Sequence, residues 1–321
     1  MSERNLFDAF WQPLIADWDL EKSFPKLRPL LAHYTSIKVL ERIVHSNEFW
    51  FSHPLAMNDS EELLFGMQLG ASTFRGSQAL AVVCKTPQRH GLLLAAFENA
   101  FGRFWNAHAF DTYVFCTSEH KRDDNVGRLS MWRGYGGNGT GAAIVLDTEK
   151  LNVYNDSPLL IDRVTYATRD ERISWVHSRV ALLVDVLEKL ELPDDQLHLP
   201  AIAFLEWLKR FSLFTKDRGF DEEHEWRAVY VRERDTQNKF DTMFGYATGR
   251  GGILPRLKLR IAPLEGSFAK TLSLSDLVYR IILGPSQSGP LALITIRRML
   301  AQLGRPDLAE RVVVSTIPYR P

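Results

Sequence analysis

The stretch from Leu30 to Ser52, LLAHYTSIKVLERIVHSNEFWFS, decides the fold class. Leu30 to Tyr34 suits a short strand, and Thr35-Ser36 can cap a helix whose apolar side chains recur at helical spacing. Asn47 suits the left-handed residue that ends such a helix, and the aromatic run after it predicts a second short strand. Two short strands with a helix between them indicate a chain in which helices and strands are mixed.

The same mixture continues without a regular alternation of one strand and one helix. Helices are predicted at 5–19, 90–109, 171–190, 199–214 and 290–303, and strands at 113–117, 142–146, 225–231, 256–261, 280–283 and 312–317. This irregular order favours an α+β fold over a doubly wound parallel sheet. We expect residues 1–29 to form an N-terminal helix and lead-in. Residues 30–321 would form a single elaborated α+β domain with a helical subdomain at about 171–214.

The composition is that of an ordinary globular protein with no excess charge. In 321 residues, 39 Lys and Arg balance 39 Asp and Glu, which argues against a broad basic face for DNA but permits a small local patch. Two cysteines are too few for a disulfide framework or a four-cysteine zinc site, and the nine histidines lack metal-ligand spacing. No secretory leader and no apolar run of ~18 residues is visible. We therefore expect a cytoplasmic protein without a metal or a membrane partner.

Two clusters near the start of the chain could carry chemistry. His33-Tyr34-Thr35 precedes a predicted helix N-terminus, where backbone N–H groups favour an anion such as a pyrophosphate. Ser52 and Asn58 could hold a ribose hydroxyl or an amide. Each cluster also has an interpretation without a ligand. His33 could be a buried histidine bonded to the backbone, and the acidic residues after Asn58 could open a helix as a capping box.

A third cluster combines Trp132, Arg133 and Tyr135 with the glycine-rich segment 134–141. Aromatic rings offer stacking faces and arginine is a strong phosphate binder, so the cluster could bind a nucleotide. A tight loop before a strand would also need the glycines, so the aromatic–arginine spacing is its informative part.

The fourth cluster lies on the strand predicted at 225–231. If the strand includes Glu223, a period of two places Glu223, Glu225 and Arg227 on one face and His224 and Trp226 on the other. Two carboxylates could stabilise a cationic transition state or bind a sugar diol. An ion-pair ladder at the surface, worth ~0–1 kcal/mol, would explain the same pattern.

Taken in order, these motifs resemble a bacterial family known as domain of unknown function 2971. The family pattern is H-Y-T, N-D-x-x-E, C-x-S, M-W-x-x-Y, E-x-E-W-R and S-x-I-P-Y. In this chain the corresponding segments are 33–35, 58–62, 116–118, 131–135, 223–227 and 315–319.

A more distant resemblance is to the ADP-ribosyltransferase fold, in which a small split β core surrounds a cleft that binds NAD. The order of His33, Ser52 and Glu225 on successive strands carries it. The resemblance implies cleavage of the glycosidic bond of NAD and transfer of ADP-ribose to a protein, DNA or RNA acceptor. Glu225 would stabilise the oxocarbenium ion, Glu223 would orient the acceptor, and His33 would bind the ribose.

The same resemblance implies a set of cofactor-binding residues. Besides His33, they would be Tyr34, Thr35, Ser52, Asn58, Trp132, Arg133 and Tyr135. Arg133 would meet the pyrophosphate and an aromatic would stack on a ring. The S-T-S segment of that superfamily is absent here, which leaves the stacking residue open between Trp132 and Tyr135.

We predict transfer of ADP-ribose from NAD to a macromolecule. A toxin or phage-defence role for this transferase, with an antitoxin or defence partner, would suit a sporadic bacterial family. Other functions fit the same residues. A non-enzymatic module that recognises a nucleotide or a nucleic-acid end would need only the aromatic–arginine loop. Metal-independent hydrolysis of a nucleotide by Glu223 and Glu225 is a third alternative. Catalysis by transfer requires His33 and Glu225 to face one cleft, which separates it from the recognition module.

Overall fold

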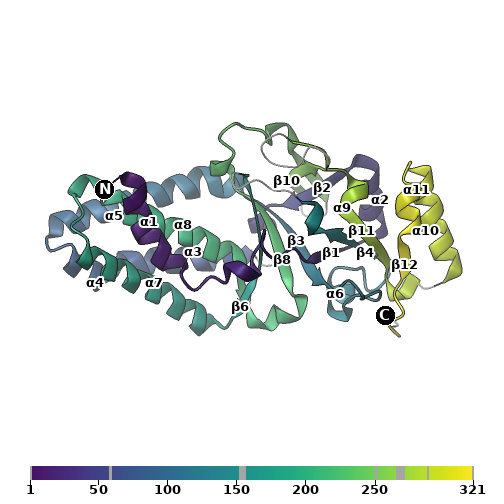
Figure 1. The fold of residues 1–321 in the computed structure, drawn as a ribbon, viewed down its shortest axis with the longest axis horizontal. Helices are drawn as coiled ribbons and strands as arrows, with labels where there is room; N and C mark the ends of the chain where they lie inside the picture. The colour runs from purple at the N-terminus through teal and green to yellow at the C-terminus, as the bar shows by residue number, and fades with distance from the viewer. Residues whose placement is uncertain are drawn as a thin grey trace. The chain divides into compact units, whose positions relative to one another are not determined.

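The computed structural model confirms a mixed α+β protein (Figure 1). It describes residues 2–57, 60–151, 157–249, 252–264, 272–287 and 289–319, except for the side chains of residues 60–62, 107, 108 and 249. The chain divides into two compact units. One consists of Met1–Leu20, Pro54–Thr112 and Thr165–Phe220, and the other of Glu21–His53, Tyr113–Val164 and Asp221–Pro321.

The first unit is helical and extends well beyond the 171–214 segment. Its helices are α1 (Glu3–Ile15), α3 (Ser60–Arg75), α4 (Gln78–Val83), α5 (Pro87–Arg103), α7 (Arg169–Lys189) and α8 (His198–Phe214). Two short parallel strands, β6 (Thr165–Ala167) and β7 (Thr215–Asp217), complete it. Helix α8 packs against α1, α3, α5 and α7, because most of its side chains are apolar and buried. The unit is thus built around the second of the two helices predicted at 171–214.

The second unit contains a large sheet. Its strands are β1 (Leu30–Thr35), β2 (Glu48–Ser52), β3 (Tyr113–His120), β4 (Ala142–Asp147), β5 (Leu159–Arg163), β8 (Glu225–Tyr230), β9 (Phe244–Gly249), β10 (Gly252–Arg260), β11 (Val278–Leu283) and β12 (Val312–Val314). Its helices are α2 (Ile37–Ser46), α6 (Leu129–Gly134), α9 (Leu274–Leu277), α10 (Pro290–Gln302) and α11 (Pro306–Glu310). The strand order is β12-β11-β4-β1-β3-β2-β10-β9, with β8 on β3 and β5 on β8. Only the β11–β12 pair of this sheet, among the described strands, is parallel.

The sheet forks at β3. One edge of β3 pairs with β8 from Tyr113 to Ser118. The other edge pairs with β1 where Ala32 opposes Ser118, and with β2 where Ser52 opposes Val114. Strands β1 and β2, which begin the two branches of the sheet, therefore both pair with the same edge of β3.

Each side of the sheet carries its own apolar cluster. The side that we call the core face includes Phe49, Phe115 and Ile281, and packs against α2 and α10. The opposite side, which we call the α6 face, includes Tyr34 and the α6 residue Trp132. Because neighbouring residues in a strand point to opposite sides, the pairing register assigns each strand residue to one of the two faces.

Local signals in the 30–52 stretch behave largely as predicted. Ser36, rather than Thr35, caps α2, with its hydroxyl accepting a hydrogen bond from the Val39 N–H at 3.3 Å. Asn47 ends the helix in the left-handed conformation, at φ 59°. The strands on either side of α2 are β1 and β2. The predicted capping box at Asp59 and Glu62 lies outside the described residues and side chains.

Candidate functional site

His33 occupies the fork between β1 and β2. Its ring lies on the core face, with centroids 4.5 Å from Phe115 and 6.5 Å from Phe49. Its Nδ1 is 3.1 Å from the carbonyl oxygen of Cys116, at the point where β1 has stopped pairing with β3. Burial lowers the pKa of His33, and the Cys116 hydrogen bond opposes this only in part. The side chain therefore sits as a neutral, backbone-bonded histidine, which matches the interpretation without a ligand.

Glu225 lies on the opposite face of the sheet. It opposes Ser118 of β3, and Ser118 opposes Ala32 of β1, so all three share the α6 face. His33 follows Ala32 and points the other way. The structure thus does not bring Glu225 and His33 into one cleft.

The carboxylate of Glu225 is paired within its own strand. Arg227 donates from Nε to Oε1 at 2.9 Å and from Nη2 to Oε2 at 3.1 Å, and Glu225 is 5% exposed. This two-point geometry is the strong form of an arginine–carboxylate pair. It is a buried pair rather than the surface ladder that the pattern also permitted.

The alternation predicted for 223–227 holds only from Glu225 onward. Trp226 lies on the core face, and its Nε1 donates to Glu119 at 3.1 Å. Glu223, however, ends a 3-10 turn, and His224 adopts a left-handed conformation at φ 44°. The predicted strand start at Glu225 is therefore confirmed, whereas extending the alternation back to Glu223 and His224 is wrong, because the left-handed residue breaks the period of two.

Tyr34 and Trp132 form a buried aromatic pair on the α6 face. Their ring centroids are 4.8 Å apart, and Trp132 is fully buried with its Nε1 donating to the Val126 carbonyl at 2.9 Å. The Tyr34 hydroxyl accepts from the Arg128 N–H at 2.9 Å, and burial raises its pKa to about 12. Trp132 thus contributes to the core under α6 and does not present a ring for stacking.

Arg133 and Tyr135 point in different directions. The short helix α6, which the glycine-rich pattern did not predict, carries Arg133, and residues two apart on a helix do not face each other. The Arg133 guanidinium lies 5.4 Å from the ring centroid of Tyr319. Tyr135 is 42% exposed, and its hydroxyl donates to Glu223 Oε1 at 3.0 Å. The predicted aromatic–arginine cluster is therefore divided between two neighbourhoods.

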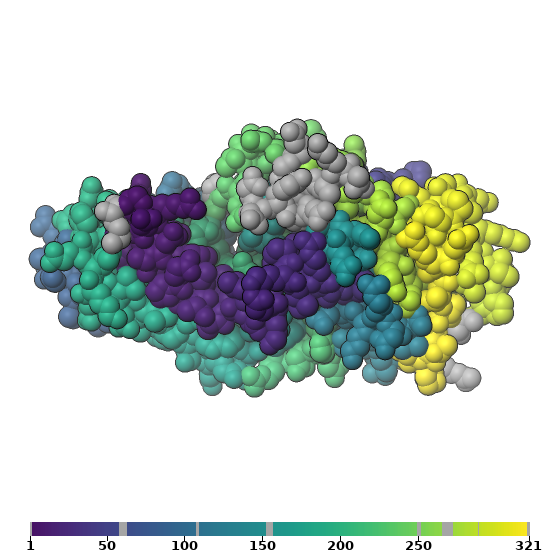
Figure 2. Space-filling model, viewed as in Figure 1, coloured from purple at the N-terminus to yellow at the C-terminus, as the bar shows by residue number. Residues whose placement is uncertain are grey.

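We call Arg133, Asn138, Ser286 and Tyr319 the loop surface. The Tyr319 hydroxyl is 3.5 Å from Asn138 Oδ1. Gly139 has φ +81°, and a Cβ there would come within 3.0 Å of both Ser286 Oγ and Tyr319 Cδ1. In Figure 2 the blue-green residues around α6 adjoin the yellow C-terminal residues. The glycine-rich loop thus packs against the S-x-I-P-Y motif.

The remaining predicted site residues are dispersed. Thr35 is buried on the core face, opposite Ala142, whereas Ser52 is half-buried on the α6 face, between Val114 and Arg256. Asn58 lies outside the described residues.

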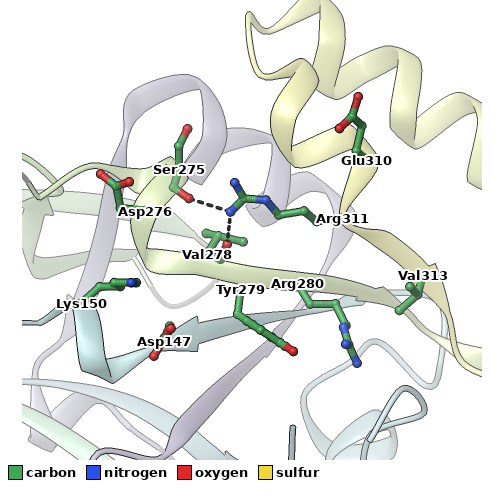
Figure 3. A pocket seen from close by; sticks show the side chains of 10 residues that line it. All are labelled: Asp147, Lys150, Ser275, Asp276, Val278, Tyr279, Arg280, Glu310, Arg311 and Val313. Atoms are coloured by element: carbon green, nitrogen blue, oxygen red, sulfur yellow. Dashed lines mark hydrogen bonds between the residues drawn. The ribbon is translucent and has the colours of Figure 1, made fainter. Parts of the chain in front are cut away.

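A pocket that the sequence did not indicate lies beside β11 (Figure 3). It has a volume of about 620 Å³ and is lined by Asp147, Lys150, Ser275, Asp276, Val278, Tyr279, Arg280, Glu310, Arg311 and Val313. Three acidic and three basic side chains balance its charge. Arg311 Nη1 donates to the carbonyls of Ser275 and Val278 at 2.6 and 2.5 Å. This guanidinium therefore links two backbone positions that line the pocket. No local pattern could reveal the pocket, because its residues come from distant segments.

Two classes of site find no support in the part of the chain that the structure describes. His, Cys, Asp and Glu side chains there do not gather in groups of three that could hold a metal ion. Among the described helices, none combines the length and the apolar character that a membrane span requires.

Comparison with known proteins adds one match. Residues 131–228 match a family model described as "Protein of unknown function (DUF2971)". The match runs from Met131 in α6 to Ala228 in β8, and it confirms the resemblance over the M-W-x-x-Y and E-x-E-W-R motifs. None of the curated proteins and none of the solved structures matches the chain.

Proposed function

We propose that this protein recognises a nucleotide or a nucleic-acid end at the loop surface, without catalysing a reaction on it. The observation that carries the proposal is the Arg133 guanidinium over the ring of Tyr319. Among the described residues, no carboxylate pairs with this guanidinium. A guanidinium held against an aromatic ring offers donors for a phosphate beside a surface on which a base can stack.

Two backbone hydrogen bonds hold the glycine-rich loop of the loop surface against a second segment of the chain. The carbonyl of Gly139 accepts from the Ser286 N–H, and that of Gly141 accepts from the Gly284 N–H, both at 2.9 Å. These bonds join the glycine-rich loop to the segment after β11. Binding then loses little free energy to ordering the loop, which favours affinity.

Recognition of a nucleotide also requires fewer residues to lie close together than transfer of ADP-ribose does. A transferase that uses both His33 and Glu225 needs them in one cleft, and they lie on opposite faces of the sheet. Recognition needs only the arginine and an aromatic ring, and Tyr319 supplies the ring in place of Trp132.

The test is binding of short single-stranded oligonucleotides with and without a 5′-phosphate. We expect the phosphorylated oligonucleotide to bind more tightly, and Arg133→Gln to remove at least about tenfold of that affinity, because hydrogen bonds to charged groups contribute about 1.5–3 kcal/mol. Arg42→Gln, an exposed arginine change on α2, is the matched control. Equal affinity of wild type and Arg133→Gln for the phosphorylated end would disprove the proposal.

Cleavage of NAD with transfer of ADP-ribose is a second candidate. The observation that favours it is the pair of carboxylates at the start of β8, where Ser118 Oγ donates to the Glu223 carbonyl at 2.6 Å and Tyr135 contacts the Glu223 side chain. Arg227 fixes the orientation of Glu225, as electrostatic stabilisation of an oxocarbenium ion would need. His33 has no part in this version of the site.

The second candidate is tested with NAD labelled in its adenylate part and with protein, DNA and RNA acceptors. Nicotinamide release or label transfer by the wild type, abolished in Glu225→Gln and retained in the exposed control Glu310→Gln, would support it. Circular dichroism must show that Glu225→Gln is folded. No turnover of NAD by the folded wild type with any acceptor would eliminate this candidate.

A further inference from the structure

Strand β10 presents a row of cations that none of the motifs above includes. In Arg256-Leu-Lys258-Leu-Arg260 the charged residues alternate with apolar ones. The apolar side chains point to the core face, where Leu257 and Leu259 are buried. The three cations therefore share the α6 face, with successive residues of the row about 6.7 Å apart along the strand.

Strand β2 lies next to β10 in the sheet (Figure 1). It places an aromatic ring beside the row of cations. Antiparallel pairing sets Trp50 opposite Lys258, and the Lys258 ammonium lies 4.5 Å from the Trp50 ring centroid. Tyr246 of β9 opposes Pro255 and so is offset by one residue from the cation row, but its ring, which is 62% exposed, still lies 5.7 Å from the same ammonium. We call Trp50, Tyr246, Arg256, Lys258 and Arg260 the β10 stripe.

Arg256 and Lys258 have no anionic partner among the described residues. Arg260 lies opposite Glu48, whose carboxylate accepts a hydrogen bond from Trp50 Nε1 at 3.1 Å. The hydrogen bond of Arg256 is to the carbonyl of Pro255 in its own strand, at 3.0 Å. Burial lowers the pKa of Arg256, and the influence of Tyr113 opposes this only in part. A half-buried guanidinium without a counter-charge is unfavourable, so an anion bound there would be stabilised.

We infer that the β10 stripe binds the backbone of a single-stranded nucleic acid, with a base stacked on the exposed ring of Tyr246. A line of evenly spaced cations suits a chain of phosphates better than one compact anion. Aromatic rings beside the cations add the stacking that distinguishes a polynucleotide from other polyanions. The stripe is local, which agrees with the balanced charge of the whole chain.

This inference uses residues other than the loop surface, so the two proposals can fail independently. The experiment measures binding of the full chain to unphosphorylated single-stranded RNA and DNA 12-mers by fluorescence anisotropy, at several salt concentrations. Three phosphate contacts predict that log K falls with log salt at a slope of about −2, since each contact on a single strand contributes about 0.7. Comparing the affinities for the RNA and the DNA 12-mers shows which of the two nucleic acids the stripe prefers.

The variants distinguish the stripe from general charge. We expect Arg256→Gln and Lys258→Gln each to weaken binding several-fold and to reduce the salt slope to about −1.4. Lys38→Gln, which removes an exposed charge on α2, should bind like the wild type. The second stripe variant keeps the test decisive if the half-buried Arg256 proves necessary for folding.

Inorganic polyphosphate separates stacking from charge. Tyr246→Ala should weaken nucleic-acid binding roughly tenfold while leaving polyphosphate binding unchanged, because polyphosphate has no base to stack. The inference is overturned if neither strand binds, if Lys38→Gln weakens binding as much as Lys258→Gln, or if Tyr246→Ala has no effect on either polymer.

Discussion

Arg227 of β8 and Arg256 of β10 lie on the same face of one sheet but differ in their partners. Arg227 is buried and makes two hydrogen bonds to the carboxylate of Glu225. Arg256 is half-buried, and its hydrogen bond goes to a backbone carbonyl. An arginine that is paired with a carboxylate of its own strand helps to hold that strand in place. An arginine without a counter-ion is a site at which an external anion would bind favourably.

This difference reverses the apparent importance of two segments, the E-x-E-W-R motif and the strand around Lys258. E-x-E-W-R is the conspicuous motif in the sequence, yet Glu225, Trp226 and Arg227 all have partners inside the sheet. The strand around Lys258 matches no motif, yet it carries Arg256 and Lys258, which lack an anionic partner among the described residues. The predictions below test the distinction, beginning with the largest expected effect.

Removing the partner of the paired arginine should have the largest effect. Glu225→Ala leaves Arg227 buried without its two-point carboxylate, and we expect the free energy of unfolding to fall by about 3–5 kcal/mol. Urea unfolding followed by circular dichroism measures the change. The exposed control Glu310→Ala should stay within about 0.5 kcal/mol of the wild type. A loss below about 1 kcal/mol for Glu225→Ala would mean that the pair is not what holds this strand.

His33 extends the comparison to a half-buried side chain whose charge depends on pH. Its folded pKa is lowered by burial, so the unfolded chain binds the proton more readily. Stability is therefore complete above the unfolded pKa of about 6.5 and decreases as the pH falls toward the folded value, by at most about 1.4 kcal/mol per pH unit. Urea unfolding at pH 7 and pH 5 should show a smaller pH effect in His33→Gln than in the wild type. An equal pH effect in both would contradict the neutral state of His33.

The unpaired arginine should respond in the opposite way to the paired one. Arg256→Met removes a desolvated charge without leaving a carboxylate unpaired, so the free energy of unfolding should stay constant or rise by up to about 1 kcal/mol. Arg227→Met is the matched variant, and it should destabilise the protein because Glu225 is then buried alone. If both variants lose stability equally in urea unfolding, the distinction between the two strands fails.

An exposed pair gives the smallest expected effect. Arg75 and Glu98, in the helical unit, form a similar two-point contact at 2.6 and 2.9 Å, but both side chains are 46% exposed. Solvent screens such a pair, so Glu98→Gln should cost less than about 1 kcal/mol in thermal or urea unfolding. A cost as large as that of Glu225→Ala would show that geometry rather than burial sets the strength of these pairs.

Much of the fold was predictable because it depends on local patterns. Ser36 and Asn47 mark the ends of α2, and the alternation in β8 correctly placed Glu225 and Arg227 on one side of the strand. Helix α6 was missed because six residues beside a glycine-rich loop have too little periodicity to detect. The start of β8 at Glu225 was predicted correctly, but nothing in the sequence signals that His224 is left-handed, so the alternation could not be known to stop before Glu223.

The candidate sites were less predictable because they depend on contacts between distant segments. The hydrogen bond between His33 and Cys116 joins residues 83 positions apart. Arg133 meets Tyr319 from the far end of the chain, which the spacing of Trp132, Arg133 and Tyr135 could not indicate.

The sequence by itself determined the α+β class, the ends of several elements and which side chains alternate along each strand. The tertiary structure decided which side of the sheet each set of side chains occupies. Alternation is a property of one strand, whereas the face depends on the register between strands. That register is fixed here by burying apolar residues of β2, β3, β8 and β10 on the core face and those of β1 on the α6 face. The same register separates His33 from Glu225 and places Lys258 beside Trp50.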